Sequence, residues 1–486
     1  MNSERLVLRN AGWLVGAQVL ATPLAIAVNA VLARRLGAAE FGWIYLAASL
    51  AGLAFLVVEA GQATALPGLV AREKARVGEL LGSALAWRGA GAALAVALLA
   101  GGAVALDAPA GLTLTLALVA LAQGLGSLAR AGLDAARGLE RADLAAAGHV
   151  GGQLLTALLV VPTLLLGGGL AAALGAQLAA AALGLAAVLA ALRPLGLPRL
   201  STARAALGAL ATGGAPFLLL GVATTLQPNV DALVLARLAP AEVLGWHGAA
   251  LKLVGALVFP ASSLISALYP TLYRLHAEDP EAYRRTAAAA LRTATVLVVP
   301  VAIGCGFFPA LGIAIFGEDG FGPAAANLRA LAVHVFLLYF SMTLGCALSA
   351  AGRQRAWALA QLGCVGAAFL LDLVLVPWFQ AHGGNGGVGV AVSLVTCEVA
   401  MLGVAIALVP RGVLDRGVAR ALARAGLSGA AMVGVALGLE RVAPGWPLLV
   451  SAALSGAAYV LALLGLGGLD ADARGALVRT VRGARK

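Results

Sequence analysis

The amino-acid sequence predicts an all-α polytopic membrane protein with about fourteen transmembrane helices. Of its 486 residues, 61% are hydrophobic and only 11% are charged, whereas charged residues make up about a quarter of a typical soluble domain. The hydrophobic residues gather in runs of roughly 20, the length of helix that crosses the hydrocarbon core of a bilayer. A third observation, an internal repeat, predicts that these helices form two related halves.

The repeat joins two stretches that lie far apart in the chain. VLARRLGAAEFGW occupies positions 31–43 and VLARLAPAEVLGW occupies positions 234–246. Both copies carry an acid (Glu40 and Glu242) and close on Gly-Trp, and each forms a charged turn between two apolar runs. Duplicated halves are a common plan among membrane transporters. We therefore expect parallel six-helix bundles over 1–200 and 201–412, followed by two further helices and a basic tail over 413–486.

Each apolar run of sufficient length predicts one helix. In the first half we expect helices near 12–33, 43–60, 84–105, 112–130, 148–167 and 170–192. In the second half we expect them near 212–236, 249–268, 290–316, 328–350, 357–378 and 387–409. The final pair lies near 422–439 and 447–466. All seven tryptophans fall at or near the ends of these segments, where the indole ring favours the membrane interface.

The distribution of Lys and Arg predicts the orientation. With the N-terminus in the cytoplasm, the cytoplasmic segments hold most of the 33 basic residues, as the positive-inside rule requires. The outer segments hold only Arg34, Arg35, Arg237, Lys252, Arg329 and Arg441. An even number of helices per half makes the two repeats parallel and places both termini in the cytoplasm. The net charge of +11 is thus a topology signal rather than a sign of nucleic-acid binding.

Neither an extramembrane enzyme nor a metal site is expected. No connection between the predicted helices is long enough to form a separate catalytic domain. The four cysteines lie inside apolar runs, without a CxxC motif or a neighbouring histidine pattern, which disfavours metal and disulfide sites. We expect no cofactor and no catalytic residue.

Polar side chains inside the predicted spans are the candidate functional residues. A charge at the centre of a span costs about 2.5–3.5 kcal/mol on insertion scales, so such residues normally face a bundle interior or a water-filled cavity. The basic and amide candidates are Arg34, Arg35, Arg88, Arg237, Lys252, Gln18, Asn29, Gln227 and Asn229. Basic residues near an interface can instead extend toward water, and Glu59 can pair with Arg88. Amides such as Gln123 and Gln153 can simply join neighbouring helices.

Three carboxylates complete the set of candidates: Asp231, Asp372 and Glu398. Pro228 precedes Asp231 and frees backbone groups that can line a cavity. A carboxylate deep in a span either pairs with an arginine or binds a proton or cation. These three are therefore the candidate sites for a coupling ion, and His334 is either a proton relay or a hydrogen-bonded structural residue.

Three longer stretches are similar to those of a known family: LARRLGAAEFGWIYLAASL, VDALVLARLAPAEVLGWHGAALKLVG and LDLVLVPWFQAHGGNGGVGVAVSLVTCEV. Their order on a fourteen-helix, positive-inside frame resembles the polysaccharide biosynthesis transporters, the O-antigen flippases of the multidrug/oligosaccharidyl-lipid/polysaccharide superfamily. The resemblance covers nearly the whole chain, although each stretch alone is a weak motif. Glycan-contacting positions are not carried over, because in this family they vary with the glycan.

The resemblance implies two six-helix bundles around a central cavity, with two extra C-terminal helices. It implies transport of undecaprenyl-diphosphate-linked oligosaccharide from the inner to the outer leaflet of the bacterial inner membrane by alternating access, often coupled to an ion gradient. The basic candidates would then bind the diphosphate and the amides the sugar hydroxyls. The implied partners are membrane lipids and the polysaccharide polymerase or glycosyltransferase machinery, and nucleic acid is not among them.

Several alternatives remain open at this point. A lipid II flippase uses the same frame. A multidrug/cation antiporter is disfavoured, because such relatives usually carry acids in the first helix, where this chain offers only Gln18, Thr22 and Asn29. A glycan polymerase or ligase would need a sizeable outer loop. A non-transporting scaffold would leave Asp372 and Glu398 without an evident use.

Overall fold

The computed structural model describes residues 3–195, 203–317, 320–442 and 445–468, and every regular element within them is a helix. The predicted all-α class is confirmed. The predicted boundary between residues 200 and 201 and the basic tail over 469–486 lie outside the described residues.

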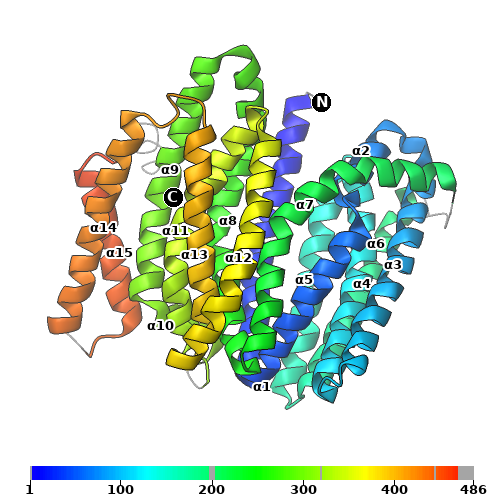
Figure 1. Cartoon of the computed structure of the whole chain (residues 1–486). Coiled ribbons are helices and arrows are strands. Elements are labelled where there is room, and N and C mark those ends of the chain that lie inside the picture. The colour runs from blue at the N-terminus through cyan, green and yellow to red at the C-terminus, as the bar shows by residue number, and fades with distance from the viewer. Residues whose placement is uncertain (1–2, 196–202, 318–319, 443–444, 469–486) are drawn as a thin grey trace, which may run out of the picture. The chain divides into compact units, whose positions relative to one another are not determined.

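The helices follow one another through short connections (Figure 1). The first group is α1 (Ser3–Glu59), α2 (Gln62–Arg72), α3 (Val77–Ala105), α4 (Ala110–Gly138), α5 (Ala142–Leu165) and α6 (Leu170–Leu192). The second is α7 (Arg204–Leu238), α8 (Ala241–Glu278), α9 (Pro280–Phe307), α10 (Pro309–Ile313), α11 (Ala324–Ala350), α12 (Gln354–Gly383) and α13 (Gly386–Leu408). The last pair is α14 (Arg416–Val442) and α15 (Leu448–Gly465). Single 3₁₀ turns cover Lys74–Arg76, Arg193–Leu195 and Ala314–Phe316.

Twelve helices in the described residues are long and apolar enough to cross a membrane, so the chain is a multi-pass membrane protein. α1 contains both of the first two predicted spans. Gly37 has non-helical angles (φ 78°, ψ 175°) and divides α1 into two segments. Only glycine adopts this backbone conformation without strain. α7, which covers the predicted span at 212–236, is not among the twelve, and the total of fourteen stays a prediction.

The described residues form two compact units. Unit 1 comprises Met1–Lys252, Phe316–Phe321 and Val365–Val390, and unit 2 comprises Leu253–Ile315, Gly322–Cys364 and Ala391–Lys486. Helices α8, α12 and α13 therefore contribute residues to both. The predicted duplication into bundles at 1–200 and 201–412, with residues 413–486 added, stays a prediction.

Each unit has its own apolar core. In unit 1, buried Leu, Val and Ala side chains of α2, α3, α4, α6 and α7 form one cluster. In unit 2, a cluster built on α8, α9, α11 and α13 includes Trp357, whose ring lies so close to Gly345 that an added Cβ would approach it to 2.6 Å. The Tyr283 hydroxyl donates to the Ala347 carbonyl at 2.7 Å, which satisfies a polar group inside this core.

The two copies of the sequence repeat pack against each other within unit 1. A Cβ added to Gly42 would lie 2.1 Å from the carbonyl oxygen of Ala241, and one added to Gly245 would lie 2.0 Å from that of Ala38. The contact is reciprocal, since each glycine follows the alanine of its own copy by four residues. Helices cross this closely only where glycine replaces a side chain.

A second glycine crossing joins the end of α1 to α7. A Cβ on Gly61 would lie 2.1 Å from the Gly214 carbonyl oxygen, and a Cβ on Gly214 would lie 2.2 Å from the Ala60 carbonyl oxygen. This crossing holds α7 against the end of α1, whereas the crossing of the repeat copies holds α8 against α1.

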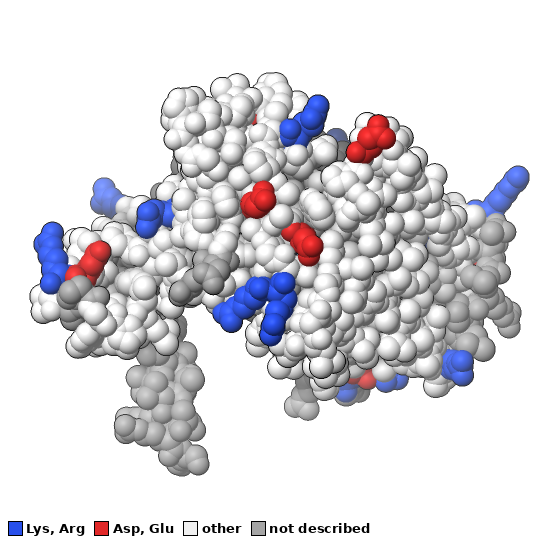
Figure 2. Space-filling view, turned by 90° about the horizontal axis from the view of Figure 1, so that it is seen from below, with Lys and Arg blue, Asp and Glu red and all other residues white. Residues whose placement is uncertain are grey.

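Charged side chains are few and scattered on the face seen from below Figure 1 (Figure 2). The orientation itself, with both termini in the cytoplasm, stays a prediction.

We expect Gly42→Val and Gly245→Val each to destabilise the protein by about 1–3 kcal/mol or more, because the added side chain must displace backbone atoms. Gly175→Val is the matched control, since an added Cβ at Gly175 meets no atom within 4 Å. Thermal unfolding of the purified protein in detergent measures the difference. Equal unfolding temperatures for all three variants would contradict the close crossing.

Candidate functional site

A polar cavity of about 280 Å³ lies within unit 1, among α1, α4, α5 and α6. Its polar lining residues are Gln123 and Arg130 of α4, His149, Gln153 and Thr156 of α5, and Gln177 of α6. The remaining lining residues are mainly alanine, glycine, leucine and valine. The cavity therefore combines amide, hydroxyl, imidazole and guanidinium groups inside a strongly apolar chain.

Helical spacing explains why these side chains converge. His149, Gln153 and Thr156 are spaced i, i+4 and i+7, so they share one face of α5. Gly152 on α5 and Gly184 on α6 also line the cavity, and the absence of side chains there leaves room between the two helices.

An ion pair positions the Arg130 side chain at the cavity. Nε and Nη2 of Arg130 donate to Glu59 Oε1 at 3.2 and 2.8 Å, and Ser127 Oγ donates to the same oxygen at 2.8 Å. Among the described residues, Nη1 has no hydrogen-bond acceptor. Arg130 thus keeps donor capacity for an anionic ligand while Glu59 fixes its position.

Two of the three predicted coupling residues meet inside unit 1. Asp231 on α7 and Asp372 on α12 are 2% and 0% exposed, and their carboxyl groups interact electrostatically with each other. Two adjoining carboxylates do not both stay ionised unless a proton or cation lies between them. The pair can therefore bind one proton or one small cation.

Two aromatic side chains accompany this acid pair. Tyr45 of α1 interacts electrostatically with Asp231, and its ring lies edge-on to His247 of α8 at a centroid distance of 6.4 Å. Both residues are buried in unit 1. Tyr45 and His247 thus belong to the environment of the pair, although the sequence analysis did not select them.

The third predicted coupling residue, Glu398, lies in unit 2. It accepts a hydrogen bond from Ser341 Oγ, and its Oε2 is 3.8 Å from Nδ1 of His334. The structure therefore places His334 beside a carboxylate, which is compatible with either of its two predicted roles. Glu398 is a separate ionisable group rather than a third member of the acid pair.

Arg88 is enclosed rather than facing a cavity. Its side chain is fully buried and donates to Gln62 Oε1 at 3.1 Å, to the Ser127 carbonyl at 2.9 Å and to Asp134 Oδ2 at 3.2 Å. The predicted pairing of Glu59 with Arg88 is wrong, because Glu59 pairs with Arg130. In this conformation Arg88 joins α3 to α4, and each of its three guanidinium nitrogens donates to a protein acceptor.

The other predicted substrate residues do not form one site. Four basic ones are exposed: Arg34, Arg35, Arg237 and Lys252. Three amides hydrogen-bond locally: Gln18 to the Thr22 hydroxyl, Asn29 to the Ala25 carbonyl and Asn229 to the Thr225 carbonyl. Gln227 is half-buried on α7. Their roles in substrate binding stay predictions.

Sequence reasoning missed most of the cavity. Gln123 and Gln153 were expected as candidates for joining helices, and Arg130, His149, Thr156 and Gln177 were not selected. The shared face of His149, Gln153 and Thr156 was a usable signal on α5. Nothing in the sequence indicated that α4 and α6 would face it.

Residues 7–276 match the polysaccharide biosynthesis protein family. The chain belongs to this family. No curated protein sequence matches it. The match covers all the helices that build the polar cavity.

Solved structures show the same fold. The lipid II flippase MurJ in its inward closed conformation aligns with a TM-score of 0.70 at 11% identity, covering 92% of this chain and 96% of that one. An inward-facing multidrug resistance MATE family transporter of the MOP superfamily gives 0.60 at 16% identity over 81% and 93%. A mutant of the Vibrio cholerae MATE transporter VcmN gives 0.56 at 14% identity over 83% and 96%. The fold of this family member is thus that of multidrug/oligosaccharidyl-lipid/polysaccharide transporters.

We expect Asp134→Asn to destabilise the protein by about 3–5 kcal/mol, because it leaves the buried Arg88 guanidinium without its anion. Arg88→Met should be milder, since Asp134 keeps its ion pair with Arg137. The double variant should recover part of the loss of Asp134→Asn. Thermal unfolding in detergent measures all three, and equal loss in the two single variants would contradict this account.

Proposed function

We propose that this protein flips a polyprenyl-diphosphate-linked oligosaccharide from the inner to the outer leaflet of the bacterial inner membrane by alternating access. The observation that supports it most directly is the polar cavity of unit 1 in a chain of the polysaccharide biosynthesis family. A diphosphate or sugar cannot enter hydrocarbon bare, since an isolated ionised group costs tens of kcal/mol in the Born limit. Polar side chains along the path replace that hydration.

The lining residues suit the two parts of such a head group. The free Nη1 of Arg130 can donate to a phosphate oxygen, and His149 lines the same cavity. The amides of Gln123, Gln153 and Gln177 can both donate to and accept from sugar hydroxyls. A volume of about 280 Å³ lies near the lower end of small-molecule sites. We therefore infer that the cavity holds the diphosphate and the adjoining sugar rather than a whole oligosaccharide.

The acid pair supplies a means of coupling transport to an ion gradient. One proton or cation held by Asp231 and Asp372 carries one charge, and moving that charge through the membrane potential contributes about 2.3 kcal/mol per 100 mV. Binding and release at this pair would favour one conformation over the other. Glu398 is a second candidate for the same role.

We expect both termini in the cytoplasm and polymerase or glycosyltransferase machinery as partners.

Lipid II is the second candidate substrate, because MurJ shares the fold. Two measurements distinguish the candidates. Deleting the gene should cause undecaprenyl-linked glycan to accumulate in the inner leaflet, and unchanged lipid-linked pools with normal surface polysaccharide would contradict the proposal. Rescue of cells that lack their peptidoglycan flippase would instead indicate lipid II.

We expect the cavity variants Gln153→Leu and Gln177→Leu to lower complementation of the deletion strain roughly tenfold each, because sugar hydroxyls lose a hydrogen-bonding partner. Gln354→Leu, at the exposed start of α12 and outside the cavity, is the control. Surface polysaccharide at matched protein levels is the readout. Full complementation by a Gln153→Leu/Gln177→Leu double variant would exclude the cavity as the head-group site.

Removing the charge of the acid pair should uncouple transport from the ion gradient. We expect Asp231→Asn and Asp372→Asn to abolish the stimulation of flipping by an imposed proton or sodium gradient in proteoliposomes, because neither variant retains two carboxylates to share an ion. Asp107→Asn, in the exposed turn between α3 and α4, is the control. Unchanged stimulation in both variants would remove the pair from the mechanism.

The exposed arginines of the two repeat copies give a further prediction. Arg35→Ala combined with Arg237→Ala should lower flipping several-fold without lowering the protein level, because two phosphate-binding charges are lost. Arg441→Ala, another basic residue of the predicted outer side, should have no such effect. Normal flux in the double variant would reduce Arg35 and Arg237 to interface anchors.

A further inference from the structure

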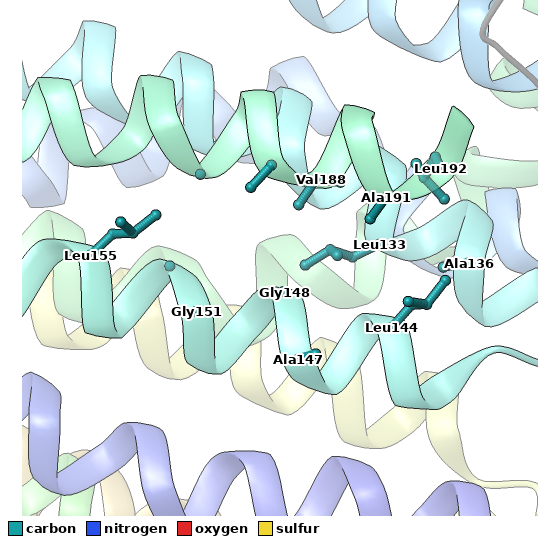
Figure 3. Close-up of a pocket in the computed structure, with 13 residues that line it drawn as sticks. Leu133, Ala136, Leu144, Ala147, Gly148, Gly151, Leu155, Val188, Ala191 and Leu192 are labelled. Atoms are coloured by element: carbon teal, nitrogen blue, oxygen red, sulfur yellow. The ribbon is translucent and has the colours of Figure 1, made fainter. Parts of the chain in front are cut away.

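A second cavity of about 280 Å³ lies in unit 1, between α5 and α6 near the end of α4 (Figure 3). All of its lining residues are leucine, valine, alanine or glycine. Figure 3 shows the side chains of Val188 and Ala191 on α6 directed toward α5, with Leu155 of α5 directed toward α6. We call this space the apolar crevice.

The apolar crevice adjoins the polar cavity. Leu133, Gly148, Gly152, Gly184 and Val188 line both. A ligand in the polar cavity therefore lies next to an apolar space bounded by α5 and α6. The two cavities together form one amphiphilic site. Polar side chains line the polar cavity, and only apolar side chains and glycines line the crevice.

We propose that the apolar crevice binds the first isoprenoid units of the polyprenyl chain while the diphosphate and sugar occupy the polar cavity. This inference rests on the proposed function and adds the place where the lipid chain is held. A purely apolar crevice offers water no polar partners, so it stays dry and accepts an apolar ligand. A soluble sugar or nucleotide would leave it unused, whereas a head group with an apolar chain attached fills both spaces.

The glycines of α5 show how the crevice can be closed selectively. Gly151 lines the crevice and not the polar cavity, and a Cβ added there meets no atom within 4 Å. Gly151→Leu therefore adds a side chain to the crevice, and its Cβ meets no neighbouring atom. Gly148 is unsuitable, because an added Cβ would lie 2.5 Å from Leu133 Cδ2. Gly175→Leu on α6 is the matched control, since Gly175 is equally unobstructed and lines neither space.

The test compares two water-soluble probes on the purified full-length protein in detergent, inorganic diphosphate and geranyl diphosphate. Burying the geranyl carbons should make the wild type and Gly175→Leu bind geranyl diphosphate at least roughly tenfold more tightly than diphosphate. Gly151→Leu should reduce this advantage to below about threefold and leave the affinity for diphosphate unchanged. Ala191→Leu, which fills the crevice from α6, repeats the test should Gly151→Leu fail to fold.

The outcomes separate the inference from the proposed function. An equal geranyl advantage in Gly151→Leu and Gly175→Leu would overturn the crevice assignment while leaving the flippase proposal intact. Loss of the advantage in wild-type protein placed in phosphatidylglycerol nanodiscs would assign the crevice to a membrane lipid and also overturn the inference. Normal pools of undecaprenyl-linked glycan after gene deletion, together with no binding of either probe, would contradict the proposed function itself.

Discussion

The reciprocal contact of Gly42 and Gly245 with the facing backbone is the constraint on which unit 1 depends. It brings the two copies of the repeat within backbone distance and so sets the separation of α1 and α8. Tyr45 follows Gly42 by three residues and packs on Gly248, and His247 lies beside it. A larger residue at either glycine would move these side chains away from Asp231. The environment of the acid pair thus depends on two glycines that have no functional side chain.

The buried carboxylates show how differently one functional group is stabilised in this chain. Asp134 lies between Arg88 and Arg137, so its charge is neutralised permanently. Asp231 faces another acid, so its charge depends on a bound proton or cation. Glu398 has a serine hydroxyl and a histidine as neighbours. Permanent pairing suits a structural joint, whereas dependence on an exchangeable ion suits a conformational cycle.

Sequence reasoning was accurate where the energetics are local to one helix. Because a charge in hydrocarbon is costly, Asp231, Asp372 and Arg88 were chosen as candidates, and all three are buried. The charged turn predicted at 31–43 contains the bend at Gly37. Sequence reasoning failed where two helices must be matched. Arg88 was considered as an alternative partner for Glu59, whereas the ion pair of Glu59 is with Arg130. Spacing assigns a side chain to a face of its own helix, but only packing decides which helix lies opposite, and the polar cavity of α4, α5 and α6 arises at that second step.

The Arg88–Asp134 ion pair also bears on how the chain is made. Each of these charges would oppose the insertion of its own helix by about 2.5–3.5 kcal/mol if it sat at the centre of a span. Paired, as they are between α3 and α4, they present the lipid with a neutral hairpin. Because the connection from Ala105 to Ala110 is short, we expect α3 and α4 to enter the membrane together as this hairpin.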